Sequence, residues 1–166
     1  FIFGRGGEEA EVLREAGIPF EIVPGVSSAV AVSAYAGIPL THRNHTASVA
    51  FVTGHEDPNK GKSGLDWPAL AGIGTLVFLM GVKNLAAIAE NLIRCGKGPA
   101  TPAALIRWGT TPDQETLTGT LGDIARKAEE GRFSPPAVFV VGGVVGLRET
   151  LNWFETKPLF GLGIVI

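Results

Sequence analysis

The sequence predicts an α/β protein, because short apolar runs and helical patterns alternate along the whole chain. Apolar residues make up 45% of the 166 residues, which is enough to bury a sizeable core. The 23 glycines and 11 prolines divide the chain into segments of the length of single helices and strands. These features together favour strands interleaved with helices.

The first segments are predicted to form a helix, a strand and a second helix. The helix over residues 8–16 has acidic residues in its first turn and Gly17 at its end. A strand is expected over residues 20–23, where Phe-Glu-Ile-Val precedes a Pro-Gly turn. Ser27 is placed to cap the next helix, which Gly37 ends.

Residues 38–47 have no clear period and are expected to connect two domains. Beyond this connector, the apolar runs predict strands, and apolar residues at helical spacing predict helices. The predicted strands cover residues 48–53, 75–80, 103–107, 115–119 and 137–141, and the predicted helices cover residues 85–93, 121–130 and 144–154.

The composition argues against several classes of protein. The formal net charge of -2 provides no broad attraction for nucleic acid or acidic membranes. No apolar run reaches the roughly 18 residues of a membrane helix, and no signal-peptide pattern is recognisable. The lone Cys95 permits no internal disulfide, which suits the cytoplasm. The three histidines match no common metal-ligand spacing, so no metal site is predicted.

A glycine-rich loop at residues 3–9 opens directly into the first helix. Such a loop exposes backbone N–H groups that can hold an anion or a polar cofactor, although a tight turn with acidic capping explains it equally well. Arg5 is the more informative residue, since an arginine between glycines is poorly suited to core packing. The spacing does not match the Rossmann fingerprint, which argues against a dinucleotide-dependent oxidoreductase.

Three further places are candidates for ligand binding. Ser27 and Ser28 begin a helix after a turn, where they can bind an amino-acid-like ligand or merely cap the helix. His42 and Arg43 lie on the connector, as donors to carboxylates or as part of a solvated loop. Met80 ends a buried strand, and it faces either a ligand or the core.

Several segments, taken in order, resemble the tetrapyrrole methylases, and among them the uroporphyrinogen-III C-methyltransferases. The resemblance extends over about residues 1–154. The segments are FIFGRGGEE (1–9), GIPFEIVPGVSSA (17–29), YAGIPLTHR (35–43), TGHE (53–56), TLVFLMG (75–81), GTTPDQ (109–114) and VVGLRETLNWF (144–154).

The resemblance implies two α/β domains, a cofactor cleft between them, and a homodimer. It implies transfer of methyl groups from S-adenosylmethionine to uroporphyrinogen III, which gives precorrin-2 for sirohaem or cobalamin and leaves S-adenosylhomocysteine. By matching position, the cofactor-binding residues are Ile2, Ser27, Ser28, Met80, Ala104 and Gly109. The candidates for binding the carboxylates of the tetrapyrrole are Arg5, His42, Arg43 and Arg148.

The sequence departs from the family pattern at its start, where a Gly/Pro-rich loop and a Gly-Asp-Pro are missing. The proton-transfer residues are therefore expected upstream of Phe1, and the chain alone is expected to bind cofactor poorly and turn over little. The predicted domains are 1–43, the end of an N-terminal methylase domain, and 44–154, the C-terminal one. Residues 155–166 resemble a linker and the start of a uroporphyrinogen-III synthase domain. The alternative is a non-catalytic fragment that carries the dimer interface and half of the cofactor cleft.

Overall fold

The computed structural model describes residues 1–55 and 64–163, and it confirms the α/β fold. A five-stranded sheet has the order β1-β2-β5-β3-β4, in which β1 and β2 are parallel and the other neighbours antiparallel. The strands are β1 (Val49–Thr53), β2 (Thr75–Leu79), β3 (Pro102–Arg107), β4 (Glu115–Thr120) and β5 (Ala137–Val141). Each predicted strand of the sheet is confirmed, with ends that shift by a single residue at most.

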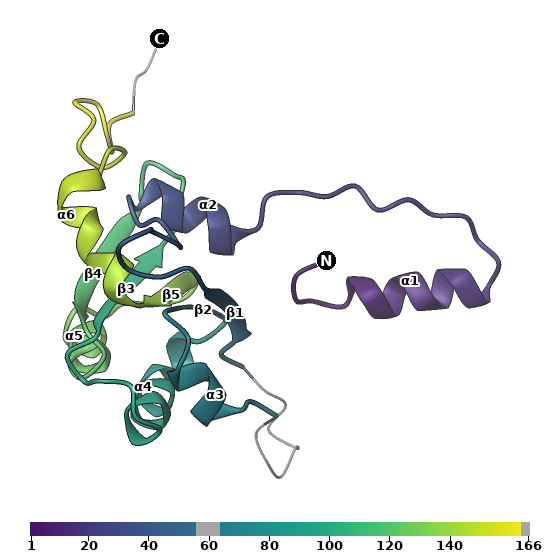
Figure 1. Ribbon diagram of the computed structural model, residues 1–166. Coiled ribbons are helices and arrows are strands. Elements are labelled where there is room, and N and C mark those ends of the chain that lie inside the picture. The colour runs from purple at the N-terminus through teal and green to yellow at the C-terminus, as the bar shows by residue number, and fades with distance from the viewer. Residues whose placement is uncertain (56–63, 164–166) are drawn as a thin grey trace.

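The helices of the described residues are α1 (Gly6–Glu15), α2 (Ser28–Tyr35), α3 (Trp67–Ala71), α4 (Leu85–Arg94), α5 (Ile124–Glu130) and α6 (Arg148–Leu151), with 3-10 segments η1 (Val82–Asn84) and η2 (Gly143–Leu147). Helices α4 and α5 cover one face of the sheet and α2 covers the other (Figure 1). The sequence did not predict α3, although its start carries a recognisable signal. Asp66 accepts a hydrogen bond from the Ala69 N–H at 3.0 Å, and a proline occupies the first turn.

Two separate cores form because successive strand residues point to opposite faces of the sheet. On one face, Leu76 and Phe78 pack with the apolar side of α4 and with α5. On the other face, Val77 and Val140 pack against α2. The helix that the sequence places over residues 85–93 is therefore confirmed together with its buried side, which consists of Leu85, Ile88, Ala89 and Leu92.

The N-terminal segment differs from its prediction. Residues 20–23 form no strand, because no neighbouring strand in the described part of the chain supplies hydrogen-bond partners. Their apolar side chains are exposed, to 85% at Val23. Helix α1 buries none of its residues and lies away from the sheet, linked to α2 by an extended stretch (Figure 1).

The helices predicted over residues 121–130 and 144–154 are shorter in the structure. The first begins at Ile124 after a turn. The second consists of η2 and α6 and ends at Leu151, where Asn152 takes an extended conformation. At that point the chain lies directly against Gly37, whose missing side chain leaves room for the Leu151 carbonyl. None of the helices in the described ranges is long and apolar enough to cross a membrane.

Candidate functional site

A cavity of about 770 Å³ opens at one edge of the sheet. The carboxyl ends of β2 and β3, the amino end of β5, the start of α2 and the first residues of the chain surround it. Its lining comprises Ile2, Phe3, Gly4, Ser28, Val32, His55, Leu79, Met80, Val82, Lys83, Ile106, Trp108, Gly109, Pro135, Pro136, Ala137 and Val138. The lining is mainly apolar with a few polar groups, which is typical of a site that binds and orients a small molecule.

Four of the six predicted cofactor-binding residues meet in this cavity: Ile2, Ser28, Met80 and Gly109. They come from segments far apart in the sequence. Met80 is 54% exposed, which rules out the alternative that its side chain fills the core. The structure thus collects these residues around one space that is large enough for a ligand.

The other two predicted cofactor-binding residues lie beside the cavity. The Ser27 hydroxyl accepts a hydrogen bond from the Ala29 N–H at 3.3 Å, so Ser27 caps α2 immediately before Ser28. Ala104 is fully buried in the core that contains α2. Ile106, two residues further along β3 and on the same face, lines the cavity instead. The structure therefore does not bring the Ala104 side chain to the cavity.

The predicted substrate-binding residues are not brought together. The side chain of Arg5 is 82% exposed and forms an ion pair with Glu8 at 2.7 Å, next to Gly4 of the cavity lining. The hydrogen bond to Glu8 and the charge of Glu8 raise the pKa of Arg5 above its ordinary value. His42 and Arg43 lie in a tight turn away from the lining, where the His42 ring contacts the His45 ring with centroids 5.1 Å apart.

Arg148 belongs to a partly buried polar network. Its guanidinium forms an ion pair with Glu155 and donates a hydrogen bond to the Ala36 carbonyl at 2.6 Å. Glu155 also accepts hydrogen bonds from Gln114 at 2.7 Å and from Thr116 at 2.6 Å. Burial alone would raise the pKa of Glu155, but these hydrogen bonds and the charge of Arg148 outweigh it and lower the pKa. The donors of Arg148 are thus engaged within the fold.

Left-handed backbone conformations gather at the cavity. Phe3, Met80 and Trp108 all line it, with φ of 58°, 60° and 47°. Such conformations are unfavourable for residues other than glycine and persist where the surroundings hold them, often at binding sites. Trp108 was not predicted as a site residue, and Phe3 was predicted only as part of the glycine-rich loop, because the sequence carries no signal for a left-handed conformation at an aromatic residue.

Two glycines bring the ends of β1 and β2 together beside the cavity. A Cβ on Gly54 would lie 2.2 Å from the Gly81 Cα, so the two backbones touch. The Asn84 side chain donates to the Gly54 carbonyl at 2.7 Å and holds this arrangement. His55 and Lys83, which the sequence analysis did not assign to the site, reach the cavity from these chain segments. In the described residues, no cluster of three potential metal ligands is present.

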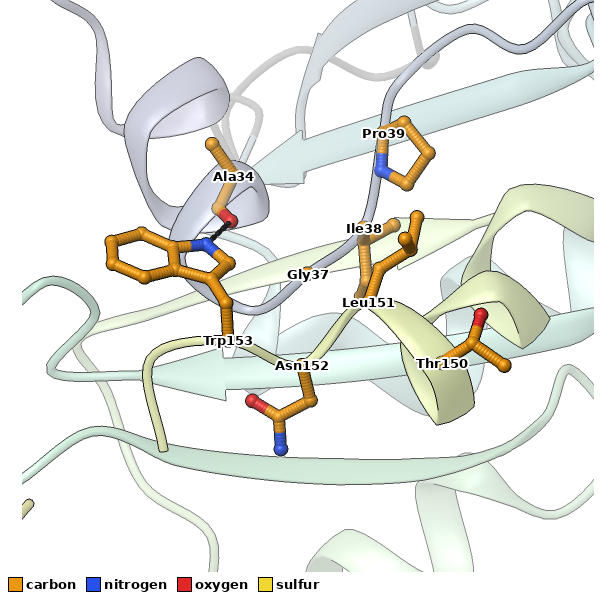
Figure 2. Close-up of a pocket in the computed structure, with 8 residues that line it drawn as sticks. All are labelled: Ala34, Gly37, Ile38, Pro39, Thr150, Leu151, Asn152 and Trp153. Atoms are coloured by element: carbon orange, nitrogen blue, oxygen red, sulfur yellow. Dashed lines mark hydrogen bonds between the residues drawn. The ribbon is translucent and has the colours of Figure 1, made fainter. Parts of the chain in front are cut away.

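A second hollow of about 530 Å³ lies between α2 and α6. Figure 2 shows its lining, in which the Trp153 indole donates to the Ala34 carbonyl at 3.0 Å. Its lining residues carry no ionisable side chain and include none of the predicted site residues: Ala34, Gly37, Ile38, Pro39, Thr150, Leu151, Asn152 and Trp153. The predicted residues that line a cavity, Ile2, Ser28, Met80 and Gly109, therefore lie in the first cavity and not in this hollow.

Comparison with known proteins gives consistent matches. The model of the family described as Tetrapyrrole (Corrin/Porphyrin) Methylases matches residues 1–125. An S-adenosyl-L-methionine-dependent uroporphyrinogen III methyltransferase from Methanosarcina barkeri is 57% identical over 153 residues, which cover 92% of this chain and 60% of the relative. A siroheme synthase from Pseudomonas fluorescens is 53% identical, over 93% of this chain and 33% of the relative. The chain thus spans about 60% or less of the length of these relatives.

A solved structure has the same fold. The uroporphyrin-III C-methyl transferase of Thermus thermophilus, complexed with S-adenyl homocysteine, is 36% identical and superposes with a TM-score of 0.74. The match covers 89% of this chain and 63% of the other. Because the family model matches most of the sequence and the M. barkeri relative is so similar, the chain belongs to the tetrapyrrole methylase family.

Proposed function

We propose that the chain takes part in S-adenosylmethionine-dependent C-methylation of uroporphyrinogen III to precorrin-2, with the cofactor in the cavity at the sheet edge. The observation that carries the proposal is the convergence of Ile2, Ser28, Met80 and Gly109 on that cavity. The M. barkeri uroporphyrinogen III methyltransferase and the T. thermophilus uroporphyrin-III C-methyl transferase support the same chemistry. They do not favour the alternative of a non-catalytic fragment.

The lining fits a cofactor with a polar amino-acid end and apolar parts. The first turn of α2 presents Ser28 to the cavity at the positive end of the helix dipole, which suits a carboxylate. The half-exposed Met80 side chain and Ile106 offer apolar contact. S-adenosylmethionine, when bound, supplies the methyl group. Methyl transfer from a sulfonium is an in-line displacement, so we assign these residues the task of binding and orienting.

We further propose that Arg5, His42 and Arg43 bind carboxylates of the tetrapyrrole, since arginine pairs well with carboxylates. Arg5 has the strongest support, because it adjoins the cavity lining and its side chain is mostly exposed. Residues 1–43 are assigned to an N-terminal domain, 44–154 to a C-terminal domain, and 155–166 to a linker and the start of a uroporphyrinogen-III synthase domain. A homodimer in the cytoplasm completes the proposal.

Calorimetry with S-adenosylhomocysteine tests the cofactor site. We expect weak but measurable binding by the unaltered chain, with a dissociation constant of roughly 100 μM, in line with the poor binding expected of the chain alone. Met80→Ala should weaken binding about tenfold, about 1.4 kcal/mol, because apolar contact to the ligand is lost. Leu159→Ala is the matched control, since Leu159 is a similarly exposed apolar residue outside the cavity lining. An absence of binding heat from the unaltered chain at millimolar ligand, or equal affinities for Met80→Ala and Leu159→Ala, would overturn the proposal.

A further inference from the structure

Gln114 is a buried amide, 4% exposed, that lies directly before β4. Its oxygen accepts a hydrogen bond from the Thr110 N–H at 2.8 Å. Its nitrogen donates to Glu155 at 2.7 Å and to the Tyr35 carbonyl at 3.3 Å. One side chain therefore connects the loop after β3, the end of α2 and the polar network of Glu155.

Two of these partners, Thr110 and Tyr35, belong to segments that form neighbouring walls of the cavity. Thr110 follows Gly109 of the lining and has a left-handed conformation, with φ of 72°. Tyr35 ends α2, which contributes Ser28 and Val32 to the lining. The two walls touch, because a Cβ on Gly109 would lie 2.5 Å from the Val32 Cγ1. Gln114 itself is not among the lining residues.

Glu155, which accepts a hydrogen bond from the Gln114 nitrogen, is itself held by other residues. Glu155 accepts a hydrogen bond from the Thr116 hydroxyl at 2.6 Å and forms an ion pair with Arg148. Arg148 in turn donates to the Ala36 carbonyl at 2.6 Å, one residue beyond α2. The Gln114 nitrogen is thus held by the Tyr35 carbonyl at the end of α2 and by Glu155, which Arg148 links to Ala36 directly after α2.

We propose that Gln114 is a positioning residue for the cofactor site: its amide holds the Gly109–Thr110 loop at a set distance from α2. This inference rests on the proposed function, because it assigns to Gln114 the shape of the cavity that binds cofactor. A side chain that only stabilised the fold would affect unfolding but leave ligand affinity unchanged.

Gln114→Met tests the inference, because methionine has nearly the same volume and removes all three hydrogen bonds. Thr116→Val is the matched control. It removes one hydrogen bond to the same Glu155 oxygen but leaves the contacts to Thr110 and Tyr35 in place. Both variants leave Glu155 with one donor fewer, so they differ in the hydrogen bonds that join the Thr110 loop to the end of α2.

Two readouts are measured on each variant. The amide of Thr110 should exchange its hydrogen about tenfold faster in Gln114→Met and at the unaltered rate in Thr116→Val, because only the first variant frees that N–H. The affinity for S-adenosylhomocysteine should fall about tenfold in Gln114→Met and remain within about twofold in Thr116→Val.

The outcomes separate the two proposals. If the unaltered chain binds S-adenosylhomocysteine and Gln114→Met binds it equally well, the positioning role is overturned and the cofactor site stands. If the unaltered chain does not bind it, both proposals fail. Should Gln114→Met not fold, Gln114→Asn replaces it, because an amide on a side chain shorter by one methylene withdraws from the Thr110 N–H and the Tyr35 carbonyl. It should bind S-adenosylhomocysteine more weakly than Thr116→Val, and equal affinities would again overturn the positioning role.

Discussion

Gly109→Ala probes the contact between the two cavity walls. The added Cβ would lie 2.5 Å, 2.6 Å and 2.9 Å from the Cγ1, Cγ2 and Cβ atoms of Val32. Carbon atoms prefer separations of roughly 3.5–4.0 Å, so the loop or α2 must retreat by about 1 Å. Overpacking of this kind costs about 1–3 kcal/mol, and we expect the free energy of unfolding to fall by that amount.

The assay is urea denaturation followed by circular dichroism, with Gly146→Ala as control because nothing lies within 4 Å of its added Cβ. Val32→Ala makes room for the methyl group, so the double variant Gly109→Ala/Val32→Ala should be more stable than the sum of the single effects by about 1 kcal/mol or more. Additivity within about 0.5 kcal/mol would refute the steric reasoning.

Three other changes have defined outcomes. Gly54→Ala forces apart the backbones at the ends of β1 and β2, and it should lower the free energy of unfolding by about 1–3 kcal/mol, whereas an unchanged urea midpoint would contradict the close approach. Glu155 has a folded pKa below its ordinary value of 4.5, so its stabilising effect is present above that value and is lost as the pH falls through the folded pKa. The free energy of unfolding in urea should therefore fall between about pH 5 and pH 3, and it should fall less in Glu155→Gln. An equal fall in the unaltered chain and in Glu155→Gln would refute this role of Glu155. Arg5→Ala should weaken the binding of uroporphyrin III about tenfold, as measured by porphyrin fluorescence, and leave the affinity for S-adenosylhomocysteine unchanged. Glu8→Gln frees Arg5 from its ion pair and should not weaken the binding of uroporphyrin III.

Much of the fold can be predicted because local sequence patterns determine it. The apolar runs that became β2 and β5 are buried on both faces, and the spacing of Leu85, Ile88 and Leu92 places one side of α4 in the core. The strand predicted over residues 20–23 is wrong for a physical reason: a strand requires hydrogen-bond partners, and a sequence pattern cannot supply them. The short α3 has too few residues to show a helical period.

The candidate site was predicted in part: local pattern made Ser28 and Met80 candidates alongside plainer explanations, and only the resemblance to a family assigned them to a cofactor site and added Gly109. Ser28, Met80 and Gly109 follow from matched motifs, and the structure brings them to one cavity. Trp108 was missed because its role depends on a backbone conformation. Gln114 was missed because its partner Glu155 lies 41 residues away, and only the folded chain brings a side chain at that separation into contact.

A crystal structure of the chain with S-adenosylhomocysteine would show whether the cofactor binds in the cavity at the sheet edge. We expect ligand density in that cavity, in contact with Ser28, Met80 and Gly109. Ligand density in the hollow between α2 and α6 shown in Figure 2, with the sheet-edge cavity empty at saturating ligand, would contradict it.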